Sequence, residues 1–397
     1  MKASSRASIL VALTVGSLLS LSITSISYAT GLDDGYPPGA AAPGRTCAPS
    51  DVGQKTTSSF TGKVLACILI QDTARWWIDG DPLPPIETPA ASAPSSGPSS
   101  GSKSAPPPVA ASNFTWSKDV NISKLKASKF ITIAGARPVQ VFIPGTLKSK
   151  VPAPLLVALH GFTASTSDLM TLMNLTPEAY KRGVVLAVPS GTRNVDGLSF
   201  WNATGSCCDF NASGVDDSAY LMDLVKQIGT KVSIDPKRIY FLGHSNGGFM
   251  SYTVACNNSA QIAAIVNLEG STFADPTQCK ADHPVSVLQI NGTADELINI
   301  NGGNVFGDPT HPYPSVKDET RNWAGINGCS TSTLLIKAKA TFDYEPSLAG
   351  AETSKESYKC PKGIAIEMWT ISGGVHVPKL NSAFISAVFD FLLSHKK

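Results

Sequence analysis

The stretch Arg238-Ile-Tyr-Phe-Leu242 runs directly into Gly243-His-Ser-Asn-Gly247, which is followed by Gly248-Phe-Met-Ser-Tyr-Thr-Val-Ala-Cys256. Its apolar, aromatic and β-branched first part predicts a strand and its last part predicts a helix, so the G-x-S-x-G pattern falls on the turn between them. In this context the pattern is that of a nucleophile elbow, in which small residues let neighbouring backbone approach a strained serine. We therefore predict that Ser245 projects its hydroxyl over the edge of a sheet. A structural glycine-rich turn is the alternative interpretation.

Short, fully apolar runs around this stretch predict further strands. They are Leu155–Leu159, Val184–Val188, Ala264–Leu268, Val285–Ile290 and Ile364–Trp369. Runs without alternation suit strands that are covered on both faces. Helix-length segments lie between them, such as 218–228 after the candidate N-caps Asp216-Asp217, and 382–393 near the end. The alternation predicts an α/β fold with a mostly parallel sheet and helices on both faces, opened by an antiparallel hairpin over 129–143.

The first part of the chain changes composition several times. Lys2 and Arg6 precede an apolar run and the small-x-small pattern Ser27-Tyr-Ala29, which predicts a secretory signal peptide over residues 1–29. An uncleaved anchor is the alternative, although the run is short for a bilayer. Residues 30–82 predict a small Cys- and Trp-containing module, residues 83–112 a Pro/Ala/Ser/Gly linker, and residues 113–397 one catalytic domain. We expect a secreted protein without a membrane span in its mature form.

Eight cysteines in a chain with an export signal indicate disulfides rather than metal ligands. We expect Cys47 and Cys67 to staple the N-terminal module, because so short a segment holds little core. Adjacent cysteines pair with each other only under strain, so Cys207 and Cys208 are expected to reach separate partners; a redox role for this vicinal pair is the alternative. Trp76-Trp77 would be either the core of the module or a platform for weak contact with polysaccharide or cell-wall polymer.

The charge balance excludes some classes of partner. Lysine and arginine together number 32, and aspartate and glutamate number 30, which leaves a net charge of +2. Because no basic cluster is present, we expect no nucleic acid partner.

A serine hydroxyl needs a base to remove its proton, and the base needs a carboxylate to hold its tautomer. In this kind of fold the chain order is serine, acid, histidine. Among six histidines, His376 lies beyond the last predicted strand and before the last helix, which makes it the predicted base. Asp295 follows the strand ending at residue 290 and is the predicted acid. Glu296, Asp308 and Asp318 are its competitors.

The tetrahedral intermediate of such chemistry needs two preorganised hydrogen-bond donors. The residue after the nucleophile supplies the first, the backbone N–H of Asn246. The second is expected from the loop His160-Gly-Phe-Thr163, from the N–H of Phe162 or Thr163. His160 itself is expected to be structural, hydrogen-bonded within this loop.

From about residue 130 to 393 the chain resembles the secreted α/β-hydrolases grouped as polyhydroxybutyrate depolymerase-like and feruloyl or acetylxylan esterase-like enzymes. The stretches that carry the resemblance are Leu159-His-Gly161, Trp201-Asn-Ala203 with Cys207-Cys208, Gly214-Val-Asp-Asp217, the stretch from Gly243 to Met250, Gly292-Thr-Ala-Asp295 and Trp369-Thr-Ile-Ser-Gly-Gly-Val-His376. It implies an α/β-hydrolase fold and the triad already derived, Ser245, Asp295 and His376. With Phe162 and Asn246 as the expected oxyanion donors, Thr163 and Trp201 are the expected substrate contacts.

The resemblance also implies that Cys207 and Cys208 pair with Cys256 and Cys279, and Cys329 with Cys360. Two positions depart from the family pattern. Asn291 stands where a histidine is usual, and Val377-Pro-Lys follows the catalytic histidine in place of a Thr-Trp-Pro-Gly run. The second departure lies near the expected entrance of the substrate site, so we expect it to affect substrate specificity more than the catalytic chemistry.

These observations predict a serine esterase that requires no metal or cofactor and acts through an acyl-enzyme on a polymer-derived ester. Polyhydroxyalkanoate and feruloylated or acetylated polysaccharide are equally compatible with the sequence. A serine peptidase of the same fold and a binding or adhesion protein with an inert hydrolase domain are the alternatives.

Overall fold

The computed structural model describes residues 52–57, 64–70, 73–78, 121–195, 197–331 and 335–397. The predicted signal peptide, Cys47 and the predicted linker lie outside the described residues. Among those residues, no helix is long and apolar enough to cross a membrane.

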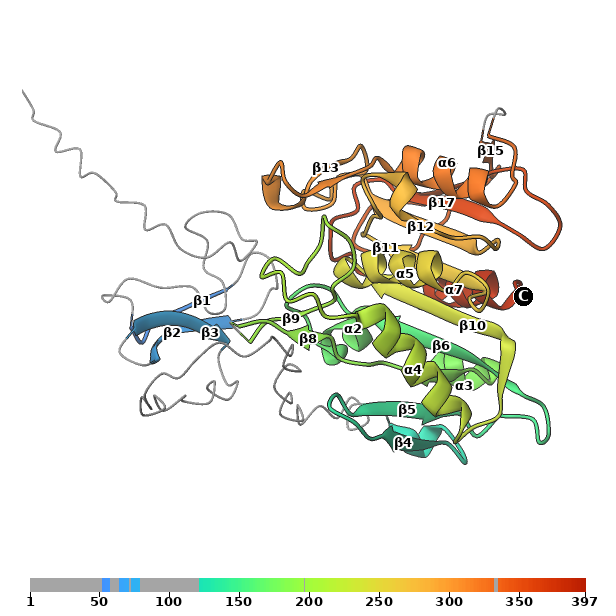
Figure 1. Cartoon of the computed structure of the whole chain (residues 1–397), viewed down its shortest axis with the longest axis horizontal. Helices are drawn as coiled ribbons and strands as arrows, with labels where there is room; N and C mark the ends of the chain where they lie inside the picture. Colours follow the sequence, from blue (N-terminus) through green and yellow to red (C-terminus); the bar gives the residue numbers. More distant parts are fainter. Residues whose placement is uncertain (1–51, 58–63, 71–72, 79–120, 196, 332–334) are drawn as a thin grey trace, which may run out of the picture. The chain divides into compact units, whose positions relative to one another are not determined.

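A ten-stranded mixed sheet organises the larger part of the chain (Figure 1). Its spatial order is β15 (Ile336–Lys337), β16 (Thr353–Ser357), β17 (Ile366–Ile371), β12 (Ser286–Gly292), β11 (Ala264–Leu268), β10 (Ile234–His244), β6 (Ala153–Leu159), β7 (Val185–Ala187), β5 (Val139–Ile143) and β4 (Lys129–Ile133). The strands from β17 to β7 run parallel, and the outer strands on each side pair antiparallel. Strands β6, β11 and β12 are buried along their whole length, as expected for strands that are covered on both faces.

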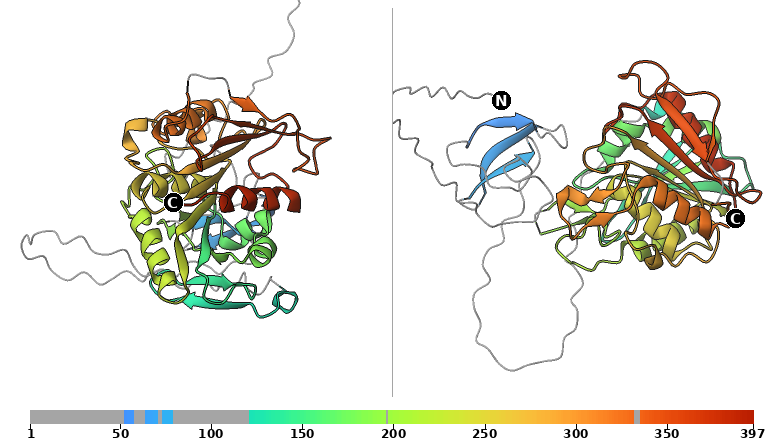
Figure 2. Two further views of the ribbon diagram at one scale, coloured as in Figure 1. Left: turned by 90° about the vertical axis from the view of Figure 1, so that its right-hand side faces the viewer. Right: turned by 90° about the horizontal axis from the view of Figure 1, so that it is seen from above.

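Helices cover both faces of this sheet, and Figure 2 shows the layers edge-on. On one face lie α4 (Asp217–Gly229), α5 (Asn246–Asn257) and α6 (Val316–Ile326), and on the other α2 (Thr166–Met173), α3 (Thr176–Arg182) and α7 (Ser382–Leu393). Side-chain caps start four of them: Ser165, Asp216, Ser315 and Asn381 each accept a hydrogen bond from a first-turn N–H. Each face of the sheet therefore has its own apolar core.

Short elements fill the connections. They are the hairpins β8 (Thr192–Arg193) with β9 (Ser199–Phe200) and β13 (Gly303–Asn304) with β14 (Pro312–Tyr313), and the 3-10 turns η2 (Ile122–Lys124), η3 (Pro276–Gln278) and η4 (Val305–Gly307). In the N-terminal part, β1 (Lys55–Thr57), β2 (Val64–Ile70) and β3 (Thr73–Ile78) form a separate antiparallel sheet. Cys67 on β2 is buried and disulfide-bonded.

The sheet and its two helical layers confirm the predicted α/β fold. Helices α4 and α7 lie where the sequence predicts them. Of the two candidate caps, Asp216 caps α4, whereas Asp217 is fully buried and its Oδ1 lies 2.6 Å from Nη1 of Arg137.

The cysteine pairing corrects one expectation. Cys207 and Cys208 are bonded to each other, not to separate partners, and Cys256 pairs with Cys279. The Cα atoms of Cys256 and Cys279 lie 4.9 Å apart, an ordinary distance for a disulfide, and this pairing leaves the adjacent cysteines to each other. The bridge between Cys329 and Cys360 is present as expected. The end of α5 is therefore tied to the segment after β11, not to the loop that holds Trp201.

Candidate active site

Strand β10 ends at His244, and Ser245 forms the turn into α5. Its backbone has φ 55° and ψ −121°, and its N–H donates to the carbonyl of Leu268 at 2.8 Å. The turn is crowded: a Cβ at Gly243 would lie 1.9 Å from the carbonyl oxygen of Gly247, and one at Gly247 would lie 2.2 Å from that of Leu159. Only glycine fits at both positions, so these two glycines allow the tight turn in which Ser245 adopts its strained backbone conformation.

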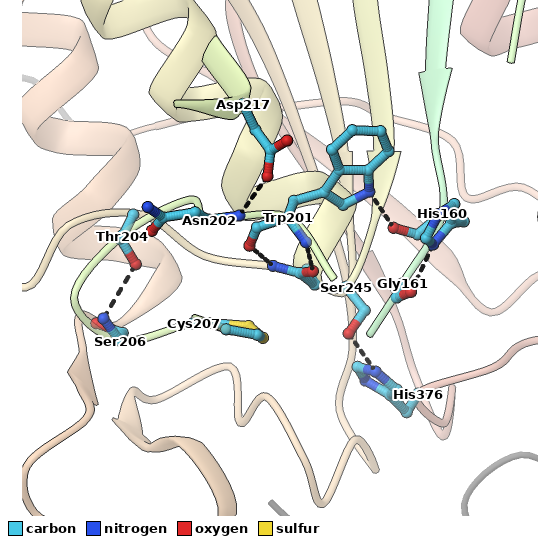
Figure 3. Close-up of a disulfide and its surroundings, with 12 residues drawn as sticks. His160, Gly161, Trp201, Asn202, Thr204, Ser206, Cys207, Asp217, Ser245 and His376 are labelled. Carbon is cyan, nitrogen blue, oxygen red and sulfur yellow. Dashed lines mark hydrogen bonds between the residues drawn. A yellow bond between two sulfur atoms is a disulfide. The ribbon is translucent and has the colours of Figure 1, made fainter. Parts of the chain in front are cut away.

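The three predicted side chains meet above the carboxyl ends of the central strands. His376, on the loop after β17, has its Nε2 2.9 Å from Oγ of Ser245 (Figure 3). Its Nδ1 lies 2.7 Å from Oδ2 of Asp295. Asp295 follows β12 and is buried, whereas 15% of the His376 side chain is exposed. The His376 imidazole is thus held by a buried carboxylate and reachable from solvent.

The carboxylate of Asp295 is surrounded by donors. Its Oδ1 accepts the N–H groups of Leu297 at 2.8 Å and Ile298 at 2.9 Å. Burial alone would raise the pKa of Asp295, but the hydrogen bond and positive charge of His376, with the Ile298 N–H, lower it below its ordinary value. Asp295 is therefore the ionised partner that fixes the Nδ1–H tautomer of His376.

A second histidine supports the loop that carries His376. Nε2 of His244 lies 2.7 Å from the carbonyl oxygen of His376. Burial lowers the pKa of His244 to about 4, with a contribution from nearby His376, so at neutral pH it is uncharged and donates this hydrogen bond.

The predicted oxyanion donors flank Ser245. Asn246 is the first residue of α5, where backbone N–H groups have no partner within the helix. A Cβ at Gly161 would lie 3.3 Å from Cβ of Ser245, so the loop that continues to Phe162 passes directly beside the nucleophile. The N–H of Thr163 donates to the carbonyl of Ser199 at 2.8 Å, which leaves Phe162 as the second candidate.

Trp201 does not have the expected substrate contact, because its side chain has no exposed surface. Its indole N–H donates to the carbonyl of His160 at 3.0 Å (Figure 3), and its backbone exchanges two hydrogen bonds with the side chain of Asn246. Trp201 therefore fixes the two segments that carry the candidate oxyanion donors. His160 is structural as predicted: Nδ1 lies 2.8 Å from the Gly161 carbonyl, and Nε2 accepts the N–H of Gly191.

The competing carboxylates are engaged elsewhere. Asp308 pairs with His311, Asp318 bonds to the cap residue Ser315, and Glu296 is exposed to solvent. The residue that the sequence analysis missed is Glu269, directly after β11, which is fully buried and in contact with Asp295. The signal was available, since a charged residue ends the apolar run Ala264–Leu268. Within the described residues, no group of three or more His, Cys, Asp or Glu side chains could hold a metal ion.

Comparison with known proteins shows which enzymes this chain is similar to. The chain is 30% identical over 247 residues to feruloyl esterase B of Piromyces equi, a match that covers 60% of this chain and 42% of that protein. It is 24% identical over 257 residues to the bifunctional acetylxylan esterase/xylanase XynS20E of Neocallimastix patriciarum, covering 64% of this chain and 33% of that protein. The chain is thus similar to feruloyl and acetylxylan esterases over its α/β-hydrolase domain. It spans less than half the length of these two relatives.

Two further comparisons add no finer assignment. The solved acetyl xylan esterase from Aspergillus awamori is 13% identical, with a TM-score of 0.48 over 67% of this chain and 99% of that one. No family model matches the chain.

Proposed function

We propose that this protein is a secreted serine carboxylester hydrolase that cleaves ester groups from polysaccharide or its fragments through an acyl-enzyme. The observation that carries the proposal is the continuous hydrogen-bonded chain from Ser245 through His376 to Asp295, at 2.9 and 2.7 Å. The names of the relatives support an ester substrate attached to a plant polymer.

In the proposed mechanism, Oγ of Ser245 attacks the ester carbonyl while Nε2 of His376 takes its proton. Asp295 stabilises the imidazolium that forms, and the N–H groups of Phe162 and Asn246 stabilise the oxyanion. His376 then protonates the leaving alcohol. A water molecule, deprotonated by His376, attacks the acyl-enzyme, releases the acid and restores Ser245.

Aromatic side chains beside the oxyanion loop favour an aromatic acyl group. The rings of Phe162 and Phe210 have centroids 5.4 Å apart, those of Phe210 and Phe306 lie 5.9 Å apart, and all three side chains are partly exposed. Such a surface can stack with a hydroxycinnamoyl ring, which an acetyl group cannot exploit. We therefore place feruloylated polysaccharide ahead of acetylated polysaccharide and polyhydroxyalkanoate, and Thr163 is the proposed polar contact.

The remaining parts of the proposal concern export and the N-terminal segment. The signal-peptide pattern over residues 1–29 and the disulfides support secretion. We propose that residues 30–82 are a separate module, joined by the linker 83–112 to the catalytic domain 113–397, and that the module contacts polysaccharide weakly.

The experiment is to measure turnover of methyl ferulate, acetylated xylan and hydroxybutyrate oligomers by wild type and Ser245→Ala. Wild type is expected to prefer methyl ferulate, and Ser245→Ala to lower kcat by about 10⁶. A fluorophosphonate probe should label wild type at Ser245 and leave the variant unlabelled. A folded wild type that neither reacts with the probe nor cleaves any ester would favour the binding-protein alternative, and cleavage of peptides alone would favour the peptidase.

A further inference from the structure

Glu269 occupies an unusual place behind the site. It is the first residue after β11, its backbone has φ 51°, and its side chain has no exposed surface. Its N–H donates to the carbonyl of Ile290 on the neighbouring strand. A non-glycine residue with positive φ and a fully buried carboxyl group is costly on both counts, so the surrounding structure must stabilise it.

The carboxyl group of Glu269 faces the catalytic acid of the proposed mechanism. The N–H of Gly292 donates to both of its oxygens, at 2.8 and 2.9 Å, and the carboxyl groups of Glu269 and Asp295 lie close enough to hydrogen-bond to each other. A hydrogen bond between two carboxyl groups requires a proton on one of them. The pair therefore carries one proton and one negative charge.

The donors around the two groups decide which of them holds the proton. Asp295 accepts hydrogen bonds from His376 and from two backbone N–H groups, whereas Glu269 accepts one backbone N–H and has the side chain of Asn291 as its other neighbouring donor. Burial, followed by the charge of Asp295, raises the pKa of Glu269 well above its usual range. The other titratable groups near the pair are His376, His244 and Tyr313. Glu319 lies further away and is reached through the buried side chains of Gln289 and Tyr252. The proton thus belongs on Glu269.

We infer that Glu269 is a positioning residue for the proposed esterase reaction: as a neutral carboxylic acid it donates a hydrogen bond to Asp295, which holds the carboxylate on Nδ1 of His376. The inference rests on the proposed function. Glu269 adds one member to the hydrogen-bonded chain that begins at Ser245. It follows β11, the strand next to β12, which Asp295 follows. Losing this donor leaves Asp295 without one of the interactions that fix its charge and orientation.

Two substitutions at residue 269 separate the possible roles. Glu269→Gln keeps a donor for Asp295 and an acceptor for Gly292, so kcat is expected to stay within about threefold of wild type. Glu269→Met keeps the length of the side chain and removes the hydrogen-bond donor. We expect kcat to fall by about tenfold or more, which corresponds to the loss of one hydrogen bond to a charged group. KM should change little in either variant, since Glu269 is out of reach of substrate.

The acid limb of the pH profile of kcat/KM reports the charge of the pair. If Glu269 is neutral, Glu269→Gln removes no charge and the limb stays in place. A shift of the limb to lower pH in this variant would mean that an anion had been removed, and would overturn the inference. Wild-type kcat in a folded Glu269→Met would overturn it equally.

Infrared spectroscopy tests the proton without relying on turnover. The wild-type spectrum at pH 7 should contain a carbonyl band of a protonated carboxyl group that Glu269→Gln loses, and the absence of such a difference would contradict the shared proton. This measurement also covers the case in which Glu269→Met does not fold.

Glu319→Met is the matched control, because Glu319 is a second fully buried carboxyl group that does not contact Asp295. It should lower the melting temperature without the loss of kcat expected for Glu269→Met. An equal loss of kcat would mean that removing any buried acid has this effect, and would overturn the inference.

The role of Glu269 and the proposed function can fail separately. An inactive wild type would refute the proposed function, whereas an active wild type with an unaffected Glu269→Met would refute only the role of Glu269.

Discussion

At the scale of single residues, the charge of Asp295 is the property that the site depends on. Asp295→Asn keeps the shape of the side chain, but its amide can present a donor to Nδ1 of His376 and so favour the wrong tautomer. We expect kcat for methyl ferulate to fall by about 10⁴ with little change in KM. The control is Glu296→Gln, which removes an exposed carboxylate at the next position. Comparable losses in both variants would contradict the assignment of the acid.

At the scale of elements, the site depends on how closely β10 and α5 approach β6. Gly247→Ala would put a Cβ 2.2 Å from the carbonyl oxygen of Leu159, so α5 would have to move and take Ser245 with it. We expect loss of fluorophosphonate labelling and a lower melting temperature. Gly229→Ala, at the end of α4, meets no atom within 4 Å and is expected to be neutral or to stabilise by about 0.5–1 kcal/mol. Normal labelling of Gly247→Ala would show that the elbow tolerates displacement.

At the scale of the whole molecule, the buried carboxyl of Glu319 links stability to pH. Tyr252 and Ser271 donate hydrogen bonds to it, and burial raises its pKa to about 8. In the unfolded chain the same group ionises near its ordinary pKa of about 4.3. The stability that Glu319 contributes is therefore complete below about pH 4.3 and is lost as the pH rises to about 8.

Glu319→Gln removes this dependence. Relative to wild type, the melting temperature of this variant is expected to be higher at pH 8 than at pH 5. The change in relative free energy of unfolding between these pH values should be about a few kcal/mol, as the pKa shift implies. Thermal melts of both proteins at the two pH values are the measurement. A difference that stays constant with pH would mean that Glu319 is not the group that titrates.

Several parts of the fold and site follow from short stretches of sequence. The apolar runs Leu155–Leu159 and Ala264–Leu268 are strands because a segment covered on both faces needs side chains without alternation. The turn at Ser245 follows from Gly243 and Gly247. The order of serine, acid and histidine selects His376 but leaves Glu296, Asp308 and Asp318 as alternatives to Asp295. The structure brings these side chains together, and their catalytic roles remain proposals.

Other parts could not be predicted, because they depend on distances between segments far apart in the chain. Adjacent cysteines predict separate partners, yet Cys256 and Cys279 come close enough in space to pair with each other. An aromatic residue such as Trp201 can be expected to contact substrate. Its side chain is buried instead, because it packs between the segments that carry His160 and Asn246.

The sequence by itself determined the strand-turn-helix frame and the types of residue at the strand ends, because these depend on local periodicity and on which positions tolerate a side chain. Only the tertiary structure decided that Glu269 holds a proton, as we infer. A carboxyl group ends an apolar strand in the sequence, but its charge state is set by burial and by the anion of Asp295, which comes from a different strand.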